Sequence, residues 1–359
     1  MSHLNRFQML LKEKGFDAAI VSDKMNQRYL SNFDFDDGLV LVTKNDAYLL
    51  TDFRYAEAAE EQTTKEMKVL LPKEGHLVCI ASLLSSHQCK RVCIEESHLS
   101  YGEFQRYEQI LKDVTLSGGA SEMLSFLRLH KDDQEIETVA RAQKITDAAF
   151  SHILNFIKPD MTEVEIALEL EYFMKRNGAE TLAFNTIAVS GSNSSRPHGV
   201  PRHTKLEKGF LTLDFGARLD GYCSDMTRTV VLGRADSEMK HLYDTVLRAQ
   251  TAALEAACEG IGCVALDRVA RDIIDHEGYK GCFGHSLGHG LGMLVHENPR
   301  VAPGASNESV LERGHIVSVE PGIYIAGKYG CRIEDLICIK NDGSVYNFTH
   351  SPKEMIELF

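Results

Sequence analysis

Residues 211–227 read LTLDFGARLDGYCSDMT, two strand-like arms around an Asp-Gly turn. An Asp-Gly pair between such arms is a strong signal for a β-hairpin, because both residues tolerate the positive φ angles of a tight turn. The chain from Phe210 onward continues in the same strand-like manner and is rich in glycine turns. This pattern predicts an antiparallel sheet as the central element of the C-terminal part of the chain.

The hairpin carries one aspartate on each arm, Asp214 and Asp225. If the loop is 219–220, Asp214 lies directly opposite Asp225; if the loop is 220–221, Asp214 faces Thr227 and Asp225 is its diagonal neighbour. Both registers place the two carboxylates on one face. On a buried face, two such carboxylates need a cation or a shared proton to offset repulsion and desolvation. The alternative is two solvated aspartates on the outward face of an open sheet.

Helical patterns accompany these strands. A long helical period begins at Glu135, and a second helix is predicted to start at the capping box formed by Thr162 and Glu165. Two further helices are expected at about residues 237–260 and 265–276. Helices packed on an antiparallel sheet make the predicted fold class α+β.

The N-terminal part of the chain reads as a separate small α/β domain. A helix, a strand, a hairpin and another strand are expected at residues 4–11, 18–21, 39–50 and 91–95. The whole chain has 359 residues, enough for two domains. Because the composition turns polar and charged at 130–133, we place the domains at residues 1–126 and 127–359.

Charge and composition narrow the class of function. The formal net charge of -13 argues against a surface that neutralises phosphates, so nucleic acid is excluded as a partner. Nine cysteines without a CxxC pair fit a reducing compartment better than a disulfide framework. The N-terminus lacks the apolar run of a signal peptide, and no stretch approaches membrane length. We therefore expect a soluble, cytoplasmic protein that does not bind membranes.

A second element, CFGHSLGHGLGMLVHENP at residues 282–299, is dense in glycine and histidine. Glycines on both sides of His289 allow close backbone approach, which suits a side chain aimed at a ligand. A phosphate-binding loop is the competing interpretation, but the Lys-Ser/Thr ending of a P-loop is missing. A zinc finger from Cys282, His285 and His289 would lack a fourth ligand.

The third element places two glutamates, Glu320 and Glu334, in apolar strand-like runs. Buried glutamates are seldom unpaired. Either Arg332 neutralises one of them, or both join Asp214 and Asp225 around cations. Four carboxylates and one imidazole suit two adjacent divalent metal ions, with manganese, cobalt, iron and zinc all compatible with these donors.

These elements, taken together, resemble the metal signature of the methionine aminopeptidase, prolidase and aminopeptidase P superfamily. The matching motifs are Gly288-His289-Gly290, Glu320-Pro321-Gly322, Arg332-Ile333-Glu334-Asp335 and the hairpin aspartates. The resemblance implies that Asp214 binds one metal, that Asp225 and Glu334 bridge the pair, and that His289 and Glu320 complete the other. It also implies a pita-bread fold for the second domain. The segment Thr51-Asp52-Phe53-Arg54-Tyr55 resembles the creatinase-type N-terminal domain of proline-specific members.

The same resemblance assigns residues on the substrate side. Two histidines, His198 and His296, would steady the tetrahedral intermediate, while Glu320 would also move a proton. The residues expected to contact the substrate are Phe184, Val295, Arg300 and Arg332.

The implied activity is hydrolysis of the Xaa-Pro bond at the N-terminus of a dipeptide or short peptide, with manganese as the first candidate metal and a homodimer as the expected assembly. The peptide partner would carry proline at its second position. Arg300 favours dipeptides, since a guanidinium could receive their C-terminal carboxylate. Two rivals are a metal-free creatinase-like hydrolase and a catalytically dead peptide-binding homologue. Both predict lost ligands, whereas all five are present.

Overall fold

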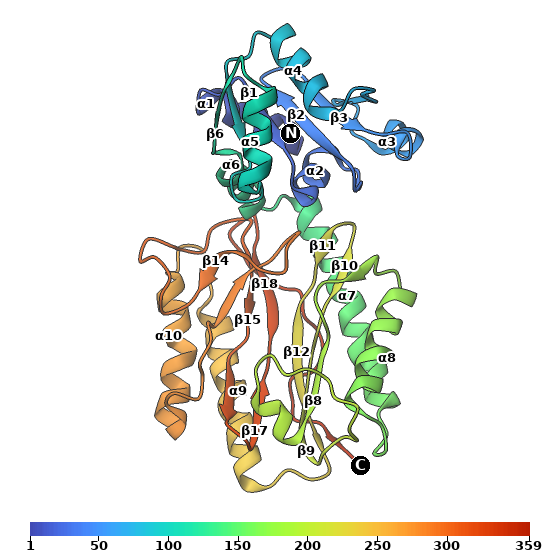
Figure 1. Ribbon diagram of the computed structural model, residues 1–359. Helices are drawn as coiled ribbons and strands as arrows, with labels where there is room; N and C mark the ends of the chain where they lie inside the picture. Colours follow the sequence, from blue (N-terminus) through green and yellow to red (C-terminus); the bar gives the residue numbers. More distant parts are fainter. The chain divides into compact units, whose positions relative to one another are not determined.

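The computed structural model describes residues 1–359, which form two compact units, Met1–Arg128 and Leu129–Phe359. Figure 1 shows the chain coloured along its sequence. No helix in either unit combines the length and apolar character needed to cross a bilayer.

The N-terminal unit is built on one mixed six-stranded sheet. Its strands, in spatial order, are β4 (Lys68–Leu70), β3 (Ala47–Thr51), β2 (Gly38–Thr43), β1 (Ala18–Val21), β5 (Arg91–Ile94) and β6 (Thr115–Ser117). Strand β1 is antiparallel to β2 and parallel to β5. The helices are α1 (His3–Glu13), α2 (Lys24–Ser31), α3 (Ala56–Gln62), α4 (His76–Ser86), α5 (Tyr101–Ile110) and α6 (Ala120–Leu129). The predicted helix, strands and hairpin of this α/β domain are all found.

The C-terminal unit contains two helix pairs that repeat each other. They are α7 (Asp133–Phe156) with α8 (Glu163–Arg176), and α9 (Ser237–Ala256) with α10 (Cys263–Ile274). The first helix of each pair ends at residue 156 or 256, and the second begins at 163 or 263, an offset of 100 in both cases. Matching bridges, Thr162 to Lys205 and Gly262 to Val310, precede α8 and α10. Figure 1 shows the pairs flanking the strands on opposite sides.

The strands of this unit lie mostly antiparallel. One sheet orders β20 (Glu357–Leu358), β12 (Met226–Leu232), β9 (Gly209–Phe215) and β8 (Ile187–Ser190). A second orders β14 (Glu297–Val301), β13 (Gly288–Gly290), β15 (Ile316–Val319), β18 (Asp335–Ile339) and β19 (Val345–Asn347). Smaller sheets join β11 (Tyr222–Cys223), β10 (Ala217–Leu219) and β7 (Thr181–Leu182), and β16 (Gly322–Ile325) with β17 (Tyr329–Arg332). Short helical turns η1 (Gly191–Ser195) and η2 (Asp275–Tyr279) complete the unit.

The β9–β12 hairpin adopts the second of the two predicted registers. Leu219 pairs with Tyr222, so the loop is Asp220-Gly221, with φ angles of 49° and 86°. Asp214 therefore pairs with Thr227. Asp225 becomes the diagonal neighbour of Asp214 on the same face.

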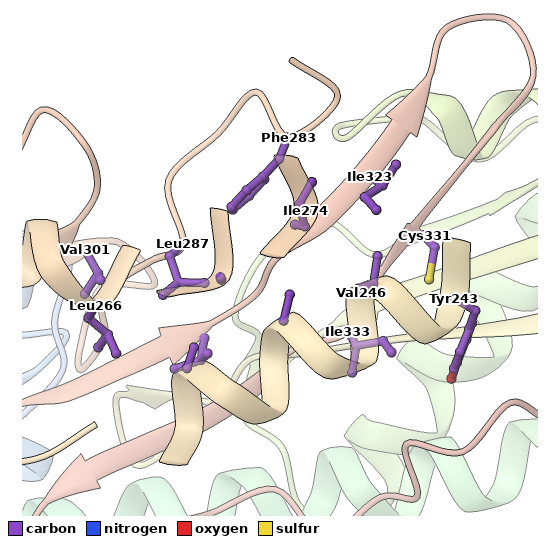
Figure 2. Close-up of a cluster of buried hydrophobic side chains, with 14 of the residues drawn as sticks. Tyr243, Val246, Leu266, Ile274, Phe283, Leu287, Val301, Ile323, Cys331 and Ile333 are labelled. Carbon is purple, nitrogen blue, oxygen red and sulfur yellow. The ribbon is translucent and has the colours of Figure 1, made fainter. Parts of the chain in front are cut away.

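Each helix pair packs on strands through its own apolar core. One core joins α7 and α8 to β8, β9 and β12. The other joins α9 and α10 to β14, β15 and β18 of the five-stranded sheet and to the β16–β17 pair, and Figure 2 shows Val246 and Leu266 among its members. Helix α9 ends at Ala256, four residues before the expected end, because Ala257 already has extended backbone angles. The strands between these cores carry the polar residues described next.

Candidate metal centre

The two hairpin aspartates are both buried. Asp214 lies on β9 and is 9% exposed, and Asp225 directly precedes β12 and is 5% exposed. The backbone N–H of Asp225 donates to Gln143 Oε1 at 3.3 Å, which ties the hairpin to α7. The outward, solvated arrangement left open by the sequence is therefore not the one adopted.

His289 lies on the short strand β13 with its imidazole held in one orientation. The Nδ1–H donates to the carbonyl of Gly290 at 3.0 Å, and the backbone N–H donates to Ser318 Oγ at 3.1 Å. Nε2 is left 3.3 Å from Glu320 Oε1 and 3.7 Å from Asp225 Oδ2. Burial lowers the pKa of His289, so the ring is neutral and Nε2 offers a lone pair to a ligand.

The two glutamates are each oriented by a neighbouring hydroxyl. Glu320 follows β15, and Ser318 Oγ donates to its Oε1 at 3.1 Å. Glu334 stands between β17 and β18, and Thr227 Oγ1 donates to its Oε2 at 2.7 Å. The ligand atoms of Asp225, His289 and Glu334 lie within 4.8 Å of one another, so three distant segments meet at one point.

The concentration of negative charge raises the pKa values of carboxyl groups in the cluster. Burial, then the charges of Asp214 and Glu320, raise the pKa of Asp225 well above its ordinary value. Burial, then Asp225, does the same for Glu334. Burial is also the main cause that raises the pKa of Glu320, to about 7, although Arg332 opposes it. Four largely buried carboxylates around one imidazole need added positive charge, either a cation or bound protons.

Asp214 supplies an independent test of whether a metal fits. Its Oδ2 accepts a hydrogen bond from Arg332 Nη2 at 2.5 Å, but its Oδ1 is buried without any hydrogen-bond partner. A buried acceptor without a donor is rare and needs an explanation such as an ion. Four carboxylates and one imidazole nitrogen match the ligand preferences of divalent transition metals. The residues therefore fit divalent metal ions.

Arg332 lies inside the cluster, and its guanidinium contacts protein groups. Besides Asp214, it donates to the hydroxyl of Tyr324 at 2.5 Å and the carbonyl of Pro197 at 3.3 Å. Its approach to a glutamate is longer, 4.0 Å from Nε to Glu320 Oε2. Arg332 thus pairs closely with Asp214 and at longer range with Glu320, and one guanidinium leaves the four carboxylates in excess.

Tyr324, Thr227 and Ser318 were not singled out by the sequence. Ser318 and Thr227 had a signal, because Ser318 lies two residues before Glu320 on one strand face and Thr227 faces Asp214 in one of the two registers. Tyr324 had none. Its hydroxyl lies 3.0 Å from Nε2 of His285, and the Nδ1–H of His285 donates to Ser286 O at 2.8 Å. Both ring nitrogens of His285 are therefore occupied, and the ligand atoms of Cys282, His285 and His289 do not gather into a metal-binding group, which removes the zinc-finger alternative.

The predicted substrate-side residues lie around this cluster. The rings of His296 and His289 meet edge to face, 4.4 Å between centroids. Burial lowers the pKa of His296, and the charges of His289 and His198 add to that effect, which puts His198 near the same site. Arg300 is exposed and pairs with His289 across β13 and β14.

The remaining two residues expected on the substrate side are Val295 and Phe184. Val295 is half-buried and adjoins His296 in the chain. Phe184, between β7 and β8, packs against the hairpin, since a methyl group on Gly216 would lie 3.0 Å from its ring.

Comparison with known proteins places this cluster in a family. The model of metallopeptidase family M24 matches residues 137–341, more than half of the chain. The chain is also 40% identical over 356 residues to an uncharacterized peptidase, YqhT, of Bacillus subtilis, with 99% of each chain covered. The chain belongs to metallopeptidase family M24. The M24 assignment covers all five residues of the cluster and confirms the resemblance seen in the motifs.

The rest of the M24 chain matches known proteins as well. Residues 3–130 match the creatinase/prolidase N-terminal domain. The solved structure of an Xaa-Pro dipeptidase from Bacillus anthracis is similar over 99% of each chain, with a TM-score of 0.93 and 38% identity. That of an X-Pro aminopeptidase from Thermotoga maritima covers 98% of this chain and 100% of its own, with a TM-score of 0.91 and 34% identity. The predicted α+β fold, a creatinase-like domain followed by a pita-bread domain, is confirmed. Membership of M24 implies divalent metal ions.

Proposed function

We propose that this protein is a dinuclear metallopeptidase that hydrolyses the Xaa-Pro bond at the N-terminus of dipeptides or short peptides. The observation that carries the proposal is the largely buried cluster of four carboxylates and a neutral imidazole, in which Asp214 Oδ1 has no hydrogen-bond partner. The similarity to proteins named Xaa-Pro dipeptidase and X-Pro aminopeptidase supports the choice of substrate.

The five residues divide between two metal sites in this proposal. Asp214 would bind one ion, Asp225 and Glu334 would contribute to both, and His289 with Glu320 would complete the second site. The grouping of Asp225, His289 and Glu334 within 4.8 Å supports one ion held in common by these three residues. Manganese is the first candidate, and cobalt, zinc or iron would also suit oxygen donors with one imidazole.

The bound metals would supply polarisation of the scissile carbonyl and a water of lowered pKa. Glu320 would carry a proton to the departing proline nitrogen. His198 and His296 would donate hydrogen bonds to the oxygen that gains charge as the carbonyl becomes tetrahedral. Both histidines are partly open to solvent, as groups that must meet a substrate need to be.

Proline explains why a shaped pocket is needed. An Xaa-Pro bond has no N–H, so the enzyme must recover affinity from contact with the ring. Phe184 and Val295 would supply apolar contact. Arg300 would receive the C-terminal carboxylate of a dipeptide, which makes dipeptides the preferred length. Arg332 also belongs to the substrate side in this proposal. We expect it to influence catalysis indirectly, because its Nη2 donates a hydrogen bond to Asp214 and so orients that ligand.

The domain boundaries, the oligomeric state and the cellular compartment are part of the same proposal. We assign the chemistry to residues 127–359 and the creatinase-like domain to 1–126, and expect a homodimer. The nine cysteines are all free, which supports a reducing compartment such as the cytoplasm.

The test is product release from Ala-Pro, Ala-Pro-Ala and Ala-Ala by purified, manganese-loaded protein. We expect proline from Ala-Pro, slower cleavage of Ala-Pro-Ala and little cleavage of Ala-Ala. Faster cleavage of Ala-Pro-Ala would make the protein an aminopeptidase for longer chains. Cleavage of none of the three would favour a creatinase-like hydrolase or a binding protein, and would overturn the proposal.

A further inference from the structure

Glu163 is a fully buried carboxylate outside the metal centre. It is the first residue of α8, and its side chain is 0% exposed. Its Oε1 accepts from Ser190 N (2.7 Å), Ser190 Oγ (3.0 Å) and Arg202 Nη2 (2.8 Å). Its Oε2 accepts from Arg202 N (2.9 Å), Arg202 Nε (3.0 Å) and Asn193 Nδ2 (3.0 Å). Each oxygen thus receives three donors, an unusually complete set for one side chain.

The donors come from both ends of one segment. Ser190 ends β8, Arg202 lies twelve positions later, and His198 stands between them. We call residues 190–202 the His198 loop. Because the backbone N–H groups of Ser190 and Arg202 both point at Glu163, one carboxylate closes the loop at its base.

The closed loop reaches the metal centre directly. The carbonyl of Pro197, next to His198, accepts from Arg332 Nη1 at 3.3 Å, and Arg332 also holds Asp214. On the far side of the loop, Ser194 Oγ accepts from Gly330 N on β17 at 3.0 Å. A change at the base of the loop would therefore alter the position of His198.

The repeat of the helix pairs shows that the fold alone does not need a carboxylate at this position. In the second pair the residue at the start of α10 is Cys263, which is buried and uncharged. Helix α8 has its own cap, since Thr162 accepts from the backbone of Glu165 and the Glu165 side chain accepts in return. Glu163 takes no part in that capping box, so its burial needs another reason.

The charge of Glu163 is retained in spite of burial. Burial by itself raises the pKa of a carboxyl, but the hydrogen bonds from Arg202 and Ser190 outweigh it and leave the pKa of Glu163 below its ordinary value. The six hydrogen bonds to its two oxygens hold the Glu163 carboxylate in one orientation, whatever the ion pair contributes to stability.

We propose that Glu163 and Arg202 form a clamp that positions His198 against the substrate. Glu163 is thus a positioning residue, and this inference rests on the proposed function for the role of His198. The clamp acts on the geometry of the His198 loop, and the chemistry stays with the residues of the metal centre.

The test compares Glu163→Gln with Glu165→Gln, which removes a carboxylate from the same helix end without touching the loop. We expect Glu163→Gln to lower kcat for Ala-Pro by about 10- to 100-fold, the scale of a small misplacement, with KM little changed. Glu165→Gln should keep kcat close to wild type. In a His198→Ala background, Glu163→Gln should add less than about a twofold further loss, since groups that act as one unit are not additive. Additive losses, or equal effects of the two glutamine variants, would overturn the clamp.

A second readout separates this inference from the proposed function. Amide hydrogen exchange over residues 191–201 should speed up in Glu163→Gln, with exchange in α7, α9 and α10 unchanged. Wild-type protein without peptidase activity would overturn the proposed function, while the exchange result still decides the clamp. Unchanged exchange in the loop would refute it. If Glu163→Gln does not fold, Arg202→Gln, which removes the guanidinium from a half-buried position, replaces it in both assays.

Discussion

At the scale of single residues, the metal centre depends on neighbours that hold each ligand in place. The Nδ1–H of His289 is committed to a backbone carbonyl, and Ser318 and Thr227 each orient one glutamate. Such partners fix the direction of a lone pair before any ion arrives. Substitutions of the ligands and of their partners should therefore have effects of different size.

Removal of a shared ligand should abolish activity. In Asp225→Ala or Glu334→Ala, we expect bound metal to be lost and kcat/KM for Ala-Pro to fall by more than about 100-fold. This loss exceeds the effect expected from removing a residue that only hydrogen-bonds a metal ligand. Asp220→Asn, in the exposed turn of the same hairpin, is the matched control and should retain both. The measurement is proline release together with metal content by mass spectrometry. Full activity in metal-free Asp225→Ala protein would contradict the ligand assignment.

Removal of a partner should weaken metal binding by less. Thr227 Oγ1 donates to Glu334 at 2.7 Å and accepts from Arg332 Nε at 3.0 Å. Thr227→Val keeps the shape and removes both bonds, so we expect metal affinity to fall by about 10- to 100-fold. Titration of metal-free protein with Mn²⁺ checks this, and wild-type affinity in the variant would show that the hydroxyl has no such role.

At the scale of elements, the glycine-rich segment 282–292 needs glycine only at some positions. A methyl group at Gly288 on β13 would lie 1.9 Å from the carbonyl oxygen of Ser318 on β15, whereas one at Gly284 would meet nothing within 4 Å. The close approach of these two backbones brings His289 to Glu320. Glycine here is thus a requirement of strand spacing.

We expect Gly288→Ala to lower the free energy of unfolding by about 1–3 kcal/mol, the usual cost of overpacking, and to reduce metal binding. Gly284→Ala, from the same segment, should change neither quantity measurably. Urea unfolding of both variants beside wild type is the measurement. Equal stability of the two variants would refute the spacing argument.

The elements that the sequence predicted well are those set by local chemistry. The Asp-Gly turn, the capping box at Thr162 and the strand patterns needed only neighbours in the chain. The hairpin register was narrowed to two, and the positive φ angles at the turn select one. Glu163 could not be predicted, because its partners lie 27 to 39 positions away. The helix-pair repeat could not be predicted from the sequence either. The two pairs share helix boundaries and a pattern of buried positions, but not the residue types at those positions.

At the scale of the whole molecule, stability depends on buried groups that must stay uncharged. Burial is the main cause that lowers the pKa of His285, to about 3, and of His315, to about 4. An unfolded histidine takes up a proton near pH 6.5, so the unfolded state binds more protons over the interval from about 6.5 to about 4. Each of these histidines therefore reduces the free energy of unfolding as the pH falls through that interval.

Between pH 6.5 and 4, we expect the free energy of unfolding to fall less in His315→Asn than in wild type. The difference between the two decreases should be about 1–3 kcal/mol. Asparagine can still accept the hydrogen bond that His315 Nδ1 accepts from Glu312 N. The raised carboxylate pKa values of the metal centre act in the opposite direction in metal-free protein, so both proteins are compared at equal metal content. His98→Gln, at an exposed position, is the control. Parallel curves for wild type and His315→Asn would contradict the prediction.

The central claim is that a buried cluster of five residues holds two metal ions for peptide hydrolysis. It is tested most directly by proline release from Ala-Pro with metal-stripped protein, followed through a titration with Mn²⁺, Co²⁺ or Zn²⁺. We predict no release before addition, and recovery that saturates near two ions per chain with at least one of these metals. Release by the stripped protein, or its absence with all three metals, would contradict the claim.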